Sequence, residues 1–544
     1  MNSFLSLILA AFVAALPAQV MLSTDPVASA SAIGHNVVRD GGGGLWSLFV
    51  YDDASATPGN RSLVLMNSTD GGQTWSVHPF MFNDATSGFI APNPVNGCTL
   101  AIDSTGTLHA VWVRYYYPTY YRQYYRNYNP LTTVASAVLD LSASLGVSTT
   151  TASAEAAIAV DASDTVWIAA QGAAGWISRL LRSTLPGASN LTFTSVGNIS
   201  PSASSQSTEL AIDSVGRIHC AYYRNVAPGN YEHRYFDPST NMWGPATTLG
   251  NTTAPNDYWG KLAADALGNV HAVYVMDCAA GASIVWKFRY KRWDPVSGWG
   301  PEVVLFDASY PQYNLIANYQ ICSLACNESS GKASVFYRDL TAGGALRLAE
   351  KGLADASFTN LPDIMPASSV NYGYHAPSIR GSLFPASNNT GNDLDLTWHM
   401  RLTATPPYAW MYQRVSSASA SLSLSAAPVI GTVVSIDLLS AADPNATFVC
   451  ALALGSTPGT VLADLRVIPL NFDSLLLLTL DPANGILVNN LASLTATGTA
   501  SVIFLIPYFP PLVGITIQSA FVVGDPFNPT GIGTISPALP ITFQ

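Results

Sequence analysis

The chain has 544 residues, of which 49% are hydrophobic and only 10% are charged, and its formal net charge is −11. The apolar fraction is sufficient for a large folded core and excludes wholesale disorder, while the length exceeds that of one compact core. The excess of 34 Asp and Glu over 23 Lys and Arg excludes the broad basic face that binding to nucleic acid or to an anionic membrane requires.

The N-terminal segment has the pattern of an export signal. An apolar run from Phe4 to Leu16 is followed by Pro17-Ala18 and then by a polar stretch, which predicts a signal peptide over residues 1–18 and a secreted or cell-surface protein. No transmembrane segment is expected elsewhere, because the apolar stretch 501–517 contains three prolines.

A motif repeated along the chain predicts the fold of residues 25–415. The segments that begin at Leu100, Leu210 and Leu262 share the pattern Leu-Ala-x-Asp-x-x-Gly-x-x-His, and a variant at Ile158 carries Trp in place of His. Each copy predicts two strands joined by a tight turn, and a period of about 50 to 65 residues leaves room for two more strands. Seven such units predict an all-β fold, a seven-bladed β-propeller, with six blades as the alternative.

The composition changes after the repeats. Residues 416–426 are rich in Ser and Ala, which predicts a linker. Residues 427–544 carry almost no charge, and their short Leu-, Val-, Ile- and Thr-rich segments are separated by Pro, Gly and Asn. This pattern predicts a small C-terminal β-sandwich, to which no activity can be assigned.

The sharpest local motif lies early in the repeat region. The Asp-box, Ser-x-Asp-x-Gly-x-Thr-Trp, is matched at every position by residues 68–75, Ser-Thr-Asp-Gly-Gly-Gln-Thr-Trp. In such a turn the Asp carboxylate accepts backbone N–H groups, and the Trp packs back between strands. The chain therefore resembles the sialidase-like β-propeller superfamily, which carries this bacterial neuraminidase repeat. The resemblance implies a structural rather than a catalytic role for the motif residues Ser68, Asp70, Gly72 and Trp75.

Recurrence of a residue type at one position of the repeat distinguishes residues that stabilise the sheets from residues that form a functional site. His109, His219 and His271 occupy one position of the repeat, six residues after a recurrent Asp. Because a residue that recurs in register serves the sheet, we expect each His to bond a turn Asp or a carbonyl rather than to form a metal ring. No phosphate-binding, dinucleotide-binding or EF-hand motif occurs, so we expect neither a cofactor nor a metal.

The opposite ends of the same strands carry the candidate site. In a propeller, the beginning of each first strand and the end of each second strand meet at one face around the central channel, where ligands usually bind. Arg114, Arg224 and Arg338 occupy equivalent strand ends, and convergent guanidinium groups suit a carboxylated sugar. The alternative is that each Arg pairs locally with a carboxylate. The further substrate-binding candidates at this face are Arg401, Lys261, His35, His375, Tyr115 and Tyr116.

Three functions remain open, each with a carbohydrate, glycoconjugate or protein partner. In a glycoside hydrolase of exo-sialidase type, Glu209 or Glu155 would activate Tyr258 as the nucleophile. Asp52 or Asp277 would then act as the acid. In a uronate polysaccharide lyase, a His at the same face would remove the proton at C5 of the sugar. A noncatalytic propeller would only bind its glycan or protein partner.

Overall fold

The structure is a computed structural model of the 544-residue chain. It describes residues 20–25, 36–41, 43–52, 60–70, 72, 74–83, 89–90, 98–116, 120–145, 156–171, 177–185, 191–201, 205–224, 230–251, 260–280, 283–310, 322–326, 331–339, 345–353, 355–360, 374–380, 393–401, 408–416, 420–440, 443, 445–456, 459–462, 467–524, 531–536 and 538–544. The predicted signal peptide lies outside these residues. The chain divides into a larger unit, Val20–Ala386 with Asp395–Tyr412, and a smaller unit that includes Gln413–Gln544.

The described residues of the larger unit form seven antiparallel sheets, each of four or five strands. The strands of the first four sheets, in chain order, are β2 (Val37–Arg39), β3 (Leu45–Asp52), β4 (Asn60–Ser68), β5 (Ser76–Val77) and β6 (Phe89–Ile90); β7 (Cys98–Ile102), β8 (Leu108–Tyr116), β9 (Tyr120–Asn129), β10 (Val134–Ala135) and β11 (Leu139–Asp140); β12 (Ala156–Val160), β13 (Val166–Gln171), β14 (Ser178–Ser183) and β15 (Phe193–Asn198); and β16 (Ser205–Ile212), β17 (Ile218–Arg224), β18 (Asn230–Asp237), β19 (Met242–Trp243) and β20 (Thr247–Asn251). A short helix, α2 (Ser142–Leu145), follows the second sheet.

The remaining three sheets follow the same plan, except that the last sheet also takes a strand from the beginning of the chain. Their strands are β21 (Gly260–Ala264), β22 (Val270–Ala280), β23 (Ser283–Asp294), β24 (Gly298–Trp299) and β25 (Val303–Tyr310); β26 (Cys322–Cys326), β27 (Ala333–Asp339), β28 (Ala345–Lys351) and β29 (Thr359–Asn360); and β30 (Tyr374–Arg380), β31 (Asp393–Arg401), β32 (Tyr408–Ser416) and β1 (Val20–Asp25).

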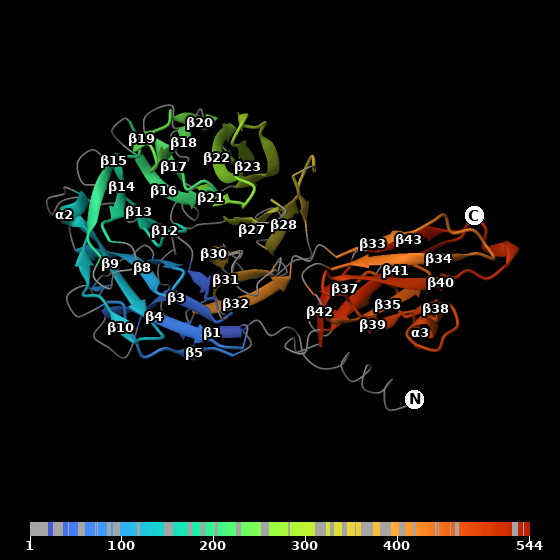
Figure 1. Ribbon diagram of the computed structural model, residues 1–544. Helices are drawn as coiled ribbons and strands as arrows, with labels where there is room; N and C mark the ends of the chain where they lie inside the picture. Colours follow the sequence, from blue (N-terminus) through green and yellow to red (C-terminus); the bar gives the residue numbers. More distant parts are fainter. Residues whose placement is uncertain are drawn as a thin grey trace. The chain divides into compact units, whose positions relative to one another are not determined.

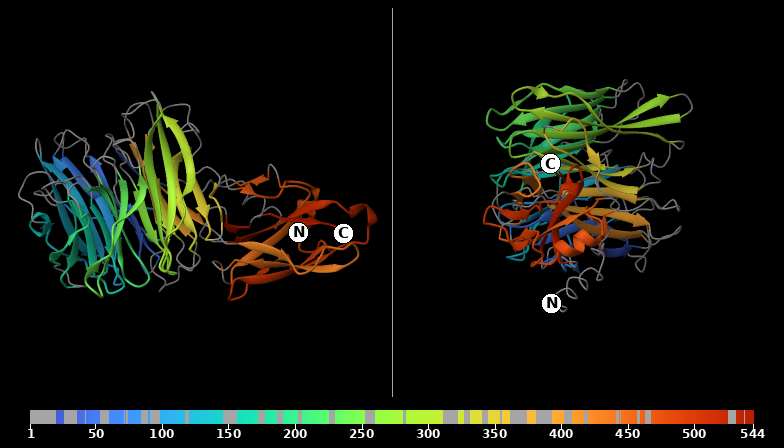
Figure 2. Two further views of the ribbon diagram at one scale, coloured as in Figure 1. Left: turned by 90° about the horizontal axis from the view of Figure 1, so that it is seen from above. Right: turned by 90° about the vertical axis from the view of Figure 1, so that its right-hand side faces the viewer.

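The first strands of successive sheets lie next to one another in a closed cycle. Each contacts the first strand of the following sheet, and β30 of the last sheet contacts β2 of the first. Figure 1 shows the sheets arranged around a common centre, and Figure 2 shows them standing side by side. The prediction of an all-β fold is therefore confirmed, and the arrangement is propeller-like, with sheet edges protected by radial packing.

The ring is closed by a strand that the sequence analysis did not include. Strand β1 pairs with β32, from Val20 opposite Tyr412 to Asp25 opposite Tyr408. It ends at Asp25, the residue at which the propeller was predicted to begin. The last sheet therefore joins strands from both ends of the larger unit.

Side chains reinforce this closure at the junction of the first and last sheets. The guanidinium of Arg39 on β2 donates from Nη2 to both carboxylate oxygens of Asp395 on β31, at 2.7 and 2.8 Å. The Tyr412 hydroxyl donates to the same carboxylate at 2.8 Å, and its buried ring stacks edge-on against Trp75. Burial raises the pKa of Tyr412 well above its ordinary value, which keeps this donor protonated.

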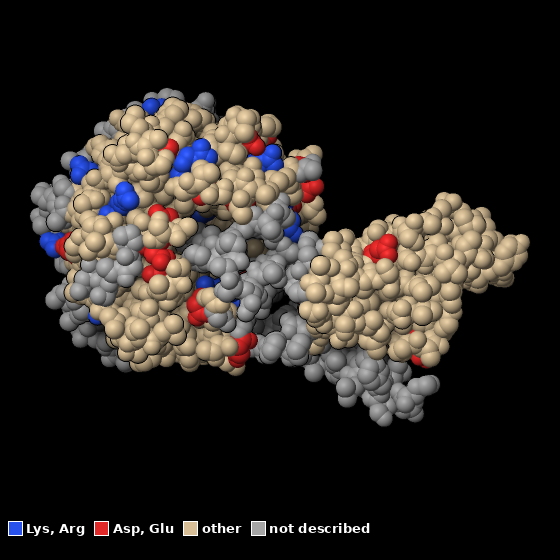
Figure 3. Space-filling view, viewed as in Figure 1, with Lys and Arg blue, Asp and Glu red and all other residues tan. Residues whose placement is uncertain are grey.

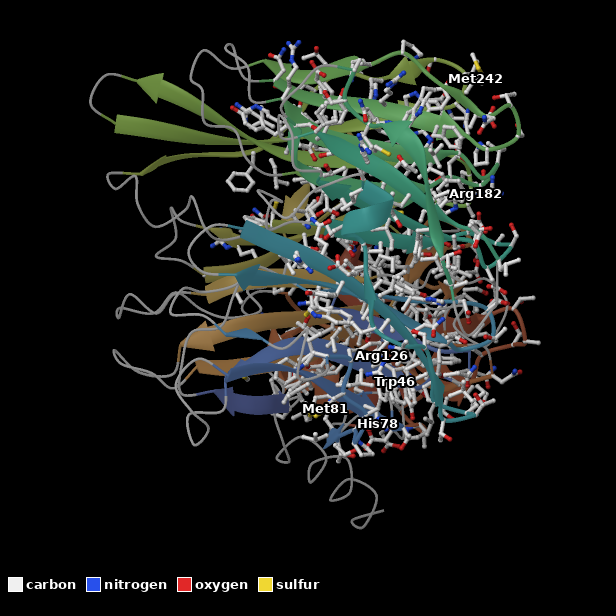
Figure 4. All side chains as sticks on the ribbon, turned by 90° about the vertical axis from the view of Figure 1, so that its left-hand side faces the viewer. Trp46, His78, Met81, Arg126, Arg182 and Met242 are labelled. Atoms are coloured by element: carbon white, nitrogen blue, oxygen red, sulfur yellow. The ribbon has the colours of Figure 1, made fainter. Side chains whose placement is uncertain are left out.

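Neighbouring sheets bury a shared core, as the first two illustrate. One cluster contains buried residues of both, including Leu48, Leu65 and Leu100. At its outer edge, Arg126 lies 4.8 Å from the centre of the Phe80 ring and donates to the Met81 carbonyl at 2.8 Å. Figure 4 shows Arg126 and Met81 on this side of the molecule, near Trp46 and His78.

The smaller unit consists mainly of two antiparallel sheets. Its elements are β33 (Ser421–Leu424), β34 (Val433–Leu439), β40 (Thr499–Leu505) and β38 (Leu487–Val488) in one sheet; β39 (Leu491–Ser493), β35 (Thr447–Ala453), β41 (Thr516–Gly524), β42 (Ile532–Ile535) and β43 (Leu539–Thr542) in the other; the pair β36 (Thr460–Val461) and β37 (Val467–Ile468); and the short helices α3 (Ser474–Thr479) and η2 (Pro510–Leu512). One core cluster contains Ile436 and Phe504 from the first sheet and Phe448 and Phe521 from the second.

Part of the expected linker is ordered sheet. Residues 421–424 fall within the segment 416–426, yet they form β33 and pair with β34 from Ser421 opposite Leu439 to Leu424 opposite Ile436. The alternation of Ser and Leu explains the difference, because it exposes the serines more than the leucines along a strand. Among the described residues, no helix is long and apolar enough to cross a membrane.

The closure ion pair yields a stability prediction. Substitution Asp395→Asn leaves the Arg39 guanidinium, 11% exposed, without its charged partner, so the free energy of unfolding should fall by about 3 kcal/mol. The control is Arg122→Met, which removes an ion pair to Asp140 whose side chains are 28% and 32% exposed and should cost less than about 1 kcal/mol. Urea unfolding measures both, and equal losses would show that Arg39 and Asp395 have no special role in closure.

Candidate functional site

The repeated turn motif is a scaffold of buried hydrogen bonds. Asp103 Oδ1 accepts from the backbone N–H of Thr105 at 2.9 Å and of Thr107 at 2.8 Å, which fixes the turn. His109 Nε2 lies 3.1 Å from Asp103 Oδ2. Burial acts to raise the pKa of Asp103, but hydrogen bonds from His109 and Thr105 outweigh it and hold the pKa below its ordinary value.

The same arrangement occurs in two other sheets. His219 and His271 bond Asp213 and Asp265, each at 3.1 Å. The expectation that each recurrent His bonds a turn Asp is therefore confirmed. No group of three His, Cys, Asp or Glu side chains that could hold a metal ion occurs among the described residues.

Tryptophan takes the role of the histidine in two sheets. Trp46 Nε1 donates to Asp40 at 2.9 Å, and Trp167 Nε1 donates to Asp161 at 2.8 Å. Both Trp and His present a ring N–H to the carboxylate, so the hydrogen bond is retained while the residue changes. The side chain at this position therefore supplies a ring N–H to the turn carboxylate in five sheets.

The Asp-box turn is likewise held by its own side chains. Asp70 Oδ1 accepts from the Thr74 N–H at 2.9 Å and from the Ser68 hydroxyl at 2.7 Å. Trp75 Nε1 donates to the Gly72 carbonyl at 3.1 Å. Gly72 has a φ of +96°, and a Cβ there would lie 2.2 Å from the Tyr412 ring, so the turn requires glycine. This turn therefore packs against the closing strand pair.

The other ends of these strands, away from the repeated turns, form the face that carries the candidate site. We call this face, where β16 and β21 begin and β17 ends, the exit end. Near this end, in the middle of β16 and opposite Ala221, Glu209 forms an ion pair with Lys261 on β21, the first strand of the next sheet. Both residues are 4% exposed. Burial raises the pKa of Glu209, and the Lys261 ammonium acts in the opposite direction. The charge of this candidate catalytic base is thus buried and matched by a cation that was expected to bind substrate.

Arg224 lies at the last position of β17, also at the exit end. Its Nε is 2.9 Å from a carboxylate oxygen of Glu232 on β18, and the Tyr222 hydroxyl donates to the other oxygen at 2.9 Å. The Arg224 side chain is 32% exposed, whereas that of Glu232 is 8% exposed. Arg224 therefore pairs locally with a carboxylate through its Nε.

A similar arrangement occurs one sheet further along the chain. The Tyr274 hydroxyl donates to Glu302 at 2.6 Å, and Arg289 Nε is 3.2 Å from the other oxygen of that carboxylate. Tyr222 and Tyr274 occupy the same position of the repeat, three residues after the recurrent His. Sequence reasoning missed both glutamates. Glu232 lies in a strand rich in aromatic residues, which is a usable signal of a buried charge, whereas the Glu302 side chain is 37% exposed.

The remaining candidates are placed only by their strands or not at all. Strands β3, β8, β22, β27, β30 and β31 contain Asp52, Arg114, Tyr115, Tyr116, Asp277, Arg338, His375 and Arg401, and the side chains of these residues lie outside the described part of the structure. Outside the described residues altogether are His35, Glu155 and Tyr258. The described part of the site is therefore the exit end of the fourth and fifth sheets.

No family model matches the chain, and no curated protein matches it. Similar solved structures include an ulvan lyase of polysaccharide lyase family PL25 bound to -[GlcA(1-4)Rha3S]-, with 11% identity, 73% of this chain and 95% of that chain covered, and a TM-score of 0.46. A mutant Aleuria aurantia lectin in complex with Fucalpha1-6GlcNAc shows 11% identity over 64% of this chain and 100% of the lectin, with a TM-score of 0.36. A mutant NanB sialidase from Streptococcus pneumoniae shows 12% identity, coverage of 73% and 70%, and a TM-score of 0.36. Similarity at this level assigns neither a family nor an activity.

The exit-end ion pair predicts an asymmetric response to substitution. Lys261→Met leaves the buried Glu209 carboxyl without a cation, so the free energy of unfolding should fall by about 3 to 5 kcal/mol. The double substitution Glu209→Leu with Lys261→Met should recover most of that loss. Lys332→Met, which removes a more exposed pair with Glu350, serves as the control in urea unfolding. A double variant as unstable as the single variant would contradict the assignment.

A second prediction concerns pH and a buried chain of rings. Trp299 Nε1 donates to His233 Nδ1 at 3.1 Å, His233 Nε2 lies 2.9 Å from His219 Nδ1, and His219 Nε2 bonds Asp213. Because an indole N–H only donates, the chain is satisfied when both histidines are neutral. Burial and the neighbouring His219 lower the pKa of His233 well below 6.5, and burial lowers that of His219.

The folded state therefore resists protonation more than the unfolded state does, and stability should fall as the pH drops below about 6.5. We expect a loss of roughly 2 kcal/mol between pH 7 and pH 5, measured by urea unfolding. In the corresponding position of two other sheets, Tyr125 and Tyr290 bond the recurrent His, each at 2.7 Å. His233→Tyr should thus retain the fold and reduce the pH dependence, whereas Tyr125→His should increase it.

Proposed function

We propose that this chain is a secreted, sialidase-like, seven-bladed β-propeller, completed by β1, with a C-terminal β-sandwich. The signal peptide of residues 1–18 would direct export. The exit end of the propeller would bind acidic glycans without cleaving them. The seven sheets and the contact between β2 and β30 support the blade count, and the core that the two sheets of the smaller unit share supports the sandwich.

One observation carries the noncatalytic part of the proposal. Glu209, which was expected to activate the nucleophile, is 4% exposed and paired with Lys261. A general base has to reach the proton that it removes, directly or through one water. A carboxylate that is both buried and neutralised by an ammonium is instead a structural group, which favours binding over hydrolysis.

Arg224 is the described residue that suits a carboxylated ligand. Its side chain is partly exposed at the exit end, and its ion pair with Glu232 involves Nε. A guanidinium has five N–H donors and binds carboxylates in a bidentate manner. We propose that Arg114, Arg338 and Arg401, which lie on strands of other sheets, contribute equivalent groups to the same face.

The test combines binding with turnover. On an array of sialylated, uronate-containing and neutral glycans, the full chain should retain carboxylated members, and Arg224→Met should weaken the measured affinity about tenfold. Lys332→Met removes a cation near the start of β27, away from the exit end, and should leave the affinity unchanged.

Turnover assays separate the alternatives. Release of 4-methylumbelliferone from a sialoside, abolished by Glu209→Gln, would replace binding with hydrolysis as the function. New absorbance from an unsaturated uronate would identify a lyase. Binding that is equally strong for neutral glycans and indifferent to Arg224 would overturn the proposed acidic ligand.

A further inference from the structure

The smaller unit exposes a run of apolar residues that the proposed function does not use. Residues 507–516 read Pro-Tyr-Phe-Pro-Pro-Leu-Val-Gly-Ile-Thr, and all except Leu512 are exposed. Tyr508 is 79% exposed and Phe509 is 54% exposed, although large aromatic side chains are normally buried. Large exposed apolar patches on folded domains often mark binding sites.

This segment is held in place by backbone hydrogen bonds on both sides. The Ile506 N–H donates to the Thr432 carbonyl at 3.0 Å, and the Gly431 N–H donates to the Ile506 carbonyl at 3.1 Å. Further along, the Gly514 N–H donates to the Phe543 carbonyl at 2.9 Å. Between these anchors, the prolines and the turn of η2 restrict the backbone. Little conformational freedom therefore remains to be lost when a ligand binds.

The Tyr508 ring lies on a glycine. A Cβ at Gly431 would be 3.0 Å from Tyr508 Cδ2 and 3.3 Å from its Cβ, so the ring approaches the backbone closely there. One part of the ring is thus supported by Gly431, while most of the side chain remains open to solvent. We call Tyr508 and Phe509, with the flanking Pro507 and Pro510, the Tyr508 platform.

The charge of the smaller unit limits which ligand fits this platform. Residues 427–544 contain six Asp, one Arg and neither Lys, Glu nor His, and residues 507–516 contain no charged side chain. Figure 3 shows the smaller unit almost free of charge in that view, apart from a few acidic groups. An acidic polysaccharide or an anionic lipid surface would require a cluster of cations, and residues 427–544 contain a single Arg.

We propose that the Tyr508 platform binds a neutral polysaccharide. The C–H faces of pyranose rings are apolar and flat, and they stack on supported aromatic rings, while the Tyr508 hydroxyl provides a polar group at the edge. No ionic contact is needed, which agrees with the composition of the unit. The chain would then carry two carbohydrate sites of opposite character, an acidic-glycan site in the larger unit and a neutral-glycan site in the smaller one.

The experiment measures retention of the full chain on microcrystalline cellulose, chitin and laminarin, with alginate as the acidic comparison. At least one neutral polymer should retain the wild-type chain, and retention should persist in high salt because no ion pair is involved. Tyr508→Ala with Phe509→Ala should weaken the apparent affinity about tenfold. Phe472→Ala, which removes a 61% exposed ring elsewhere in the same unit, is the matched control and should have no effect.

The outcomes also separate this site from the proposed one. The platform variant should leave binding to alginate unchanged, and Arg224→Met should leave binding to the neutral polymer unchanged. Failure of every neutral polymer to retain the chain would overturn the inference. Two other results would then identify a different occupant of the platform. One is self-association in sedimentation velocity that the platform variant abolishes, and the other is binding to uncharged phosphatidylcholine vesicles that the same variant abolishes.

Discussion

Closure of the ring is the constraint on which the larger unit depends. Every other junction joins sheets that follow each other along the chain, whereas the last junction brings together segments 356 residues apart, as the hydrogen bonds between Arg39 and Asp395 show. Bringing distant segments together costs loop-closure entropy that adjacent sheets largely avoid. The structure concentrates directional interactions there: the β1–β32 ladder, the ion pair of Arg39 with Asp395, and the Tyr412 ring between the Asp-box and that carboxylate.

Within the sheets, one position shows how a repeated geometry tolerates different residues. The turn carboxylate receives an N–H from His109 in one sheet and from Trp167 in the next. Histidine suits both a metal ring and a scaffold, and its recurrence in register predicted the scaffold. The tryptophans decide between them, since an indole cannot ligate a metal through its N–H but can satisfy the same buried carboxylate. A change of residue type at a repeated position can therefore reveal the chemical role of that position better than recurrence of one residue type.

The strands and turns of the repeat could be predicted from the sequence, because local periodicity determines them. Strand, Asp-x-x-Gly turn and strand lie within about a dozen residues, so their pairing follows from the pattern itself. Strand β1 carries no repeat motif, and its partner lies nearly 400 residues away, so nothing local indicated it.

The same reasoning explains why the side-chain pairs of the candidate site were not predicted. Glu209 and Lys261 are 52 residues apart on separate sheets, and Glu232 faces Tyr222 only because of the register of β17 and β18. Side-chain pairing at the exit end depends on register and on packing between sheets, which no single segment determines.

The two ion pairs at the exit end differ in a way that bears on function. A buried ion pair contributes little net stability, because the cost of removing both charges from water offsets their attraction, and an apolar pair of similar size would be about as stable. Only 10% of the residues of this chain are charged, so a buried pair needs another explanation than stability. Because Glu209 and Lys261 lie on neighbouring sheets, their pairing fixes the orientation of the fourth sheet relative to the fifth. Arg224 retains access to solvent, so its charge remains effective toward a ligand. If the first pair sets the position of β16 relative to β21, it also sets the distance from Arg224 to any group on the fifth sheet. The described part of the exit end then combines a buried ion pair that orients the two sheets with a partly exposed arginine that reaches solvent.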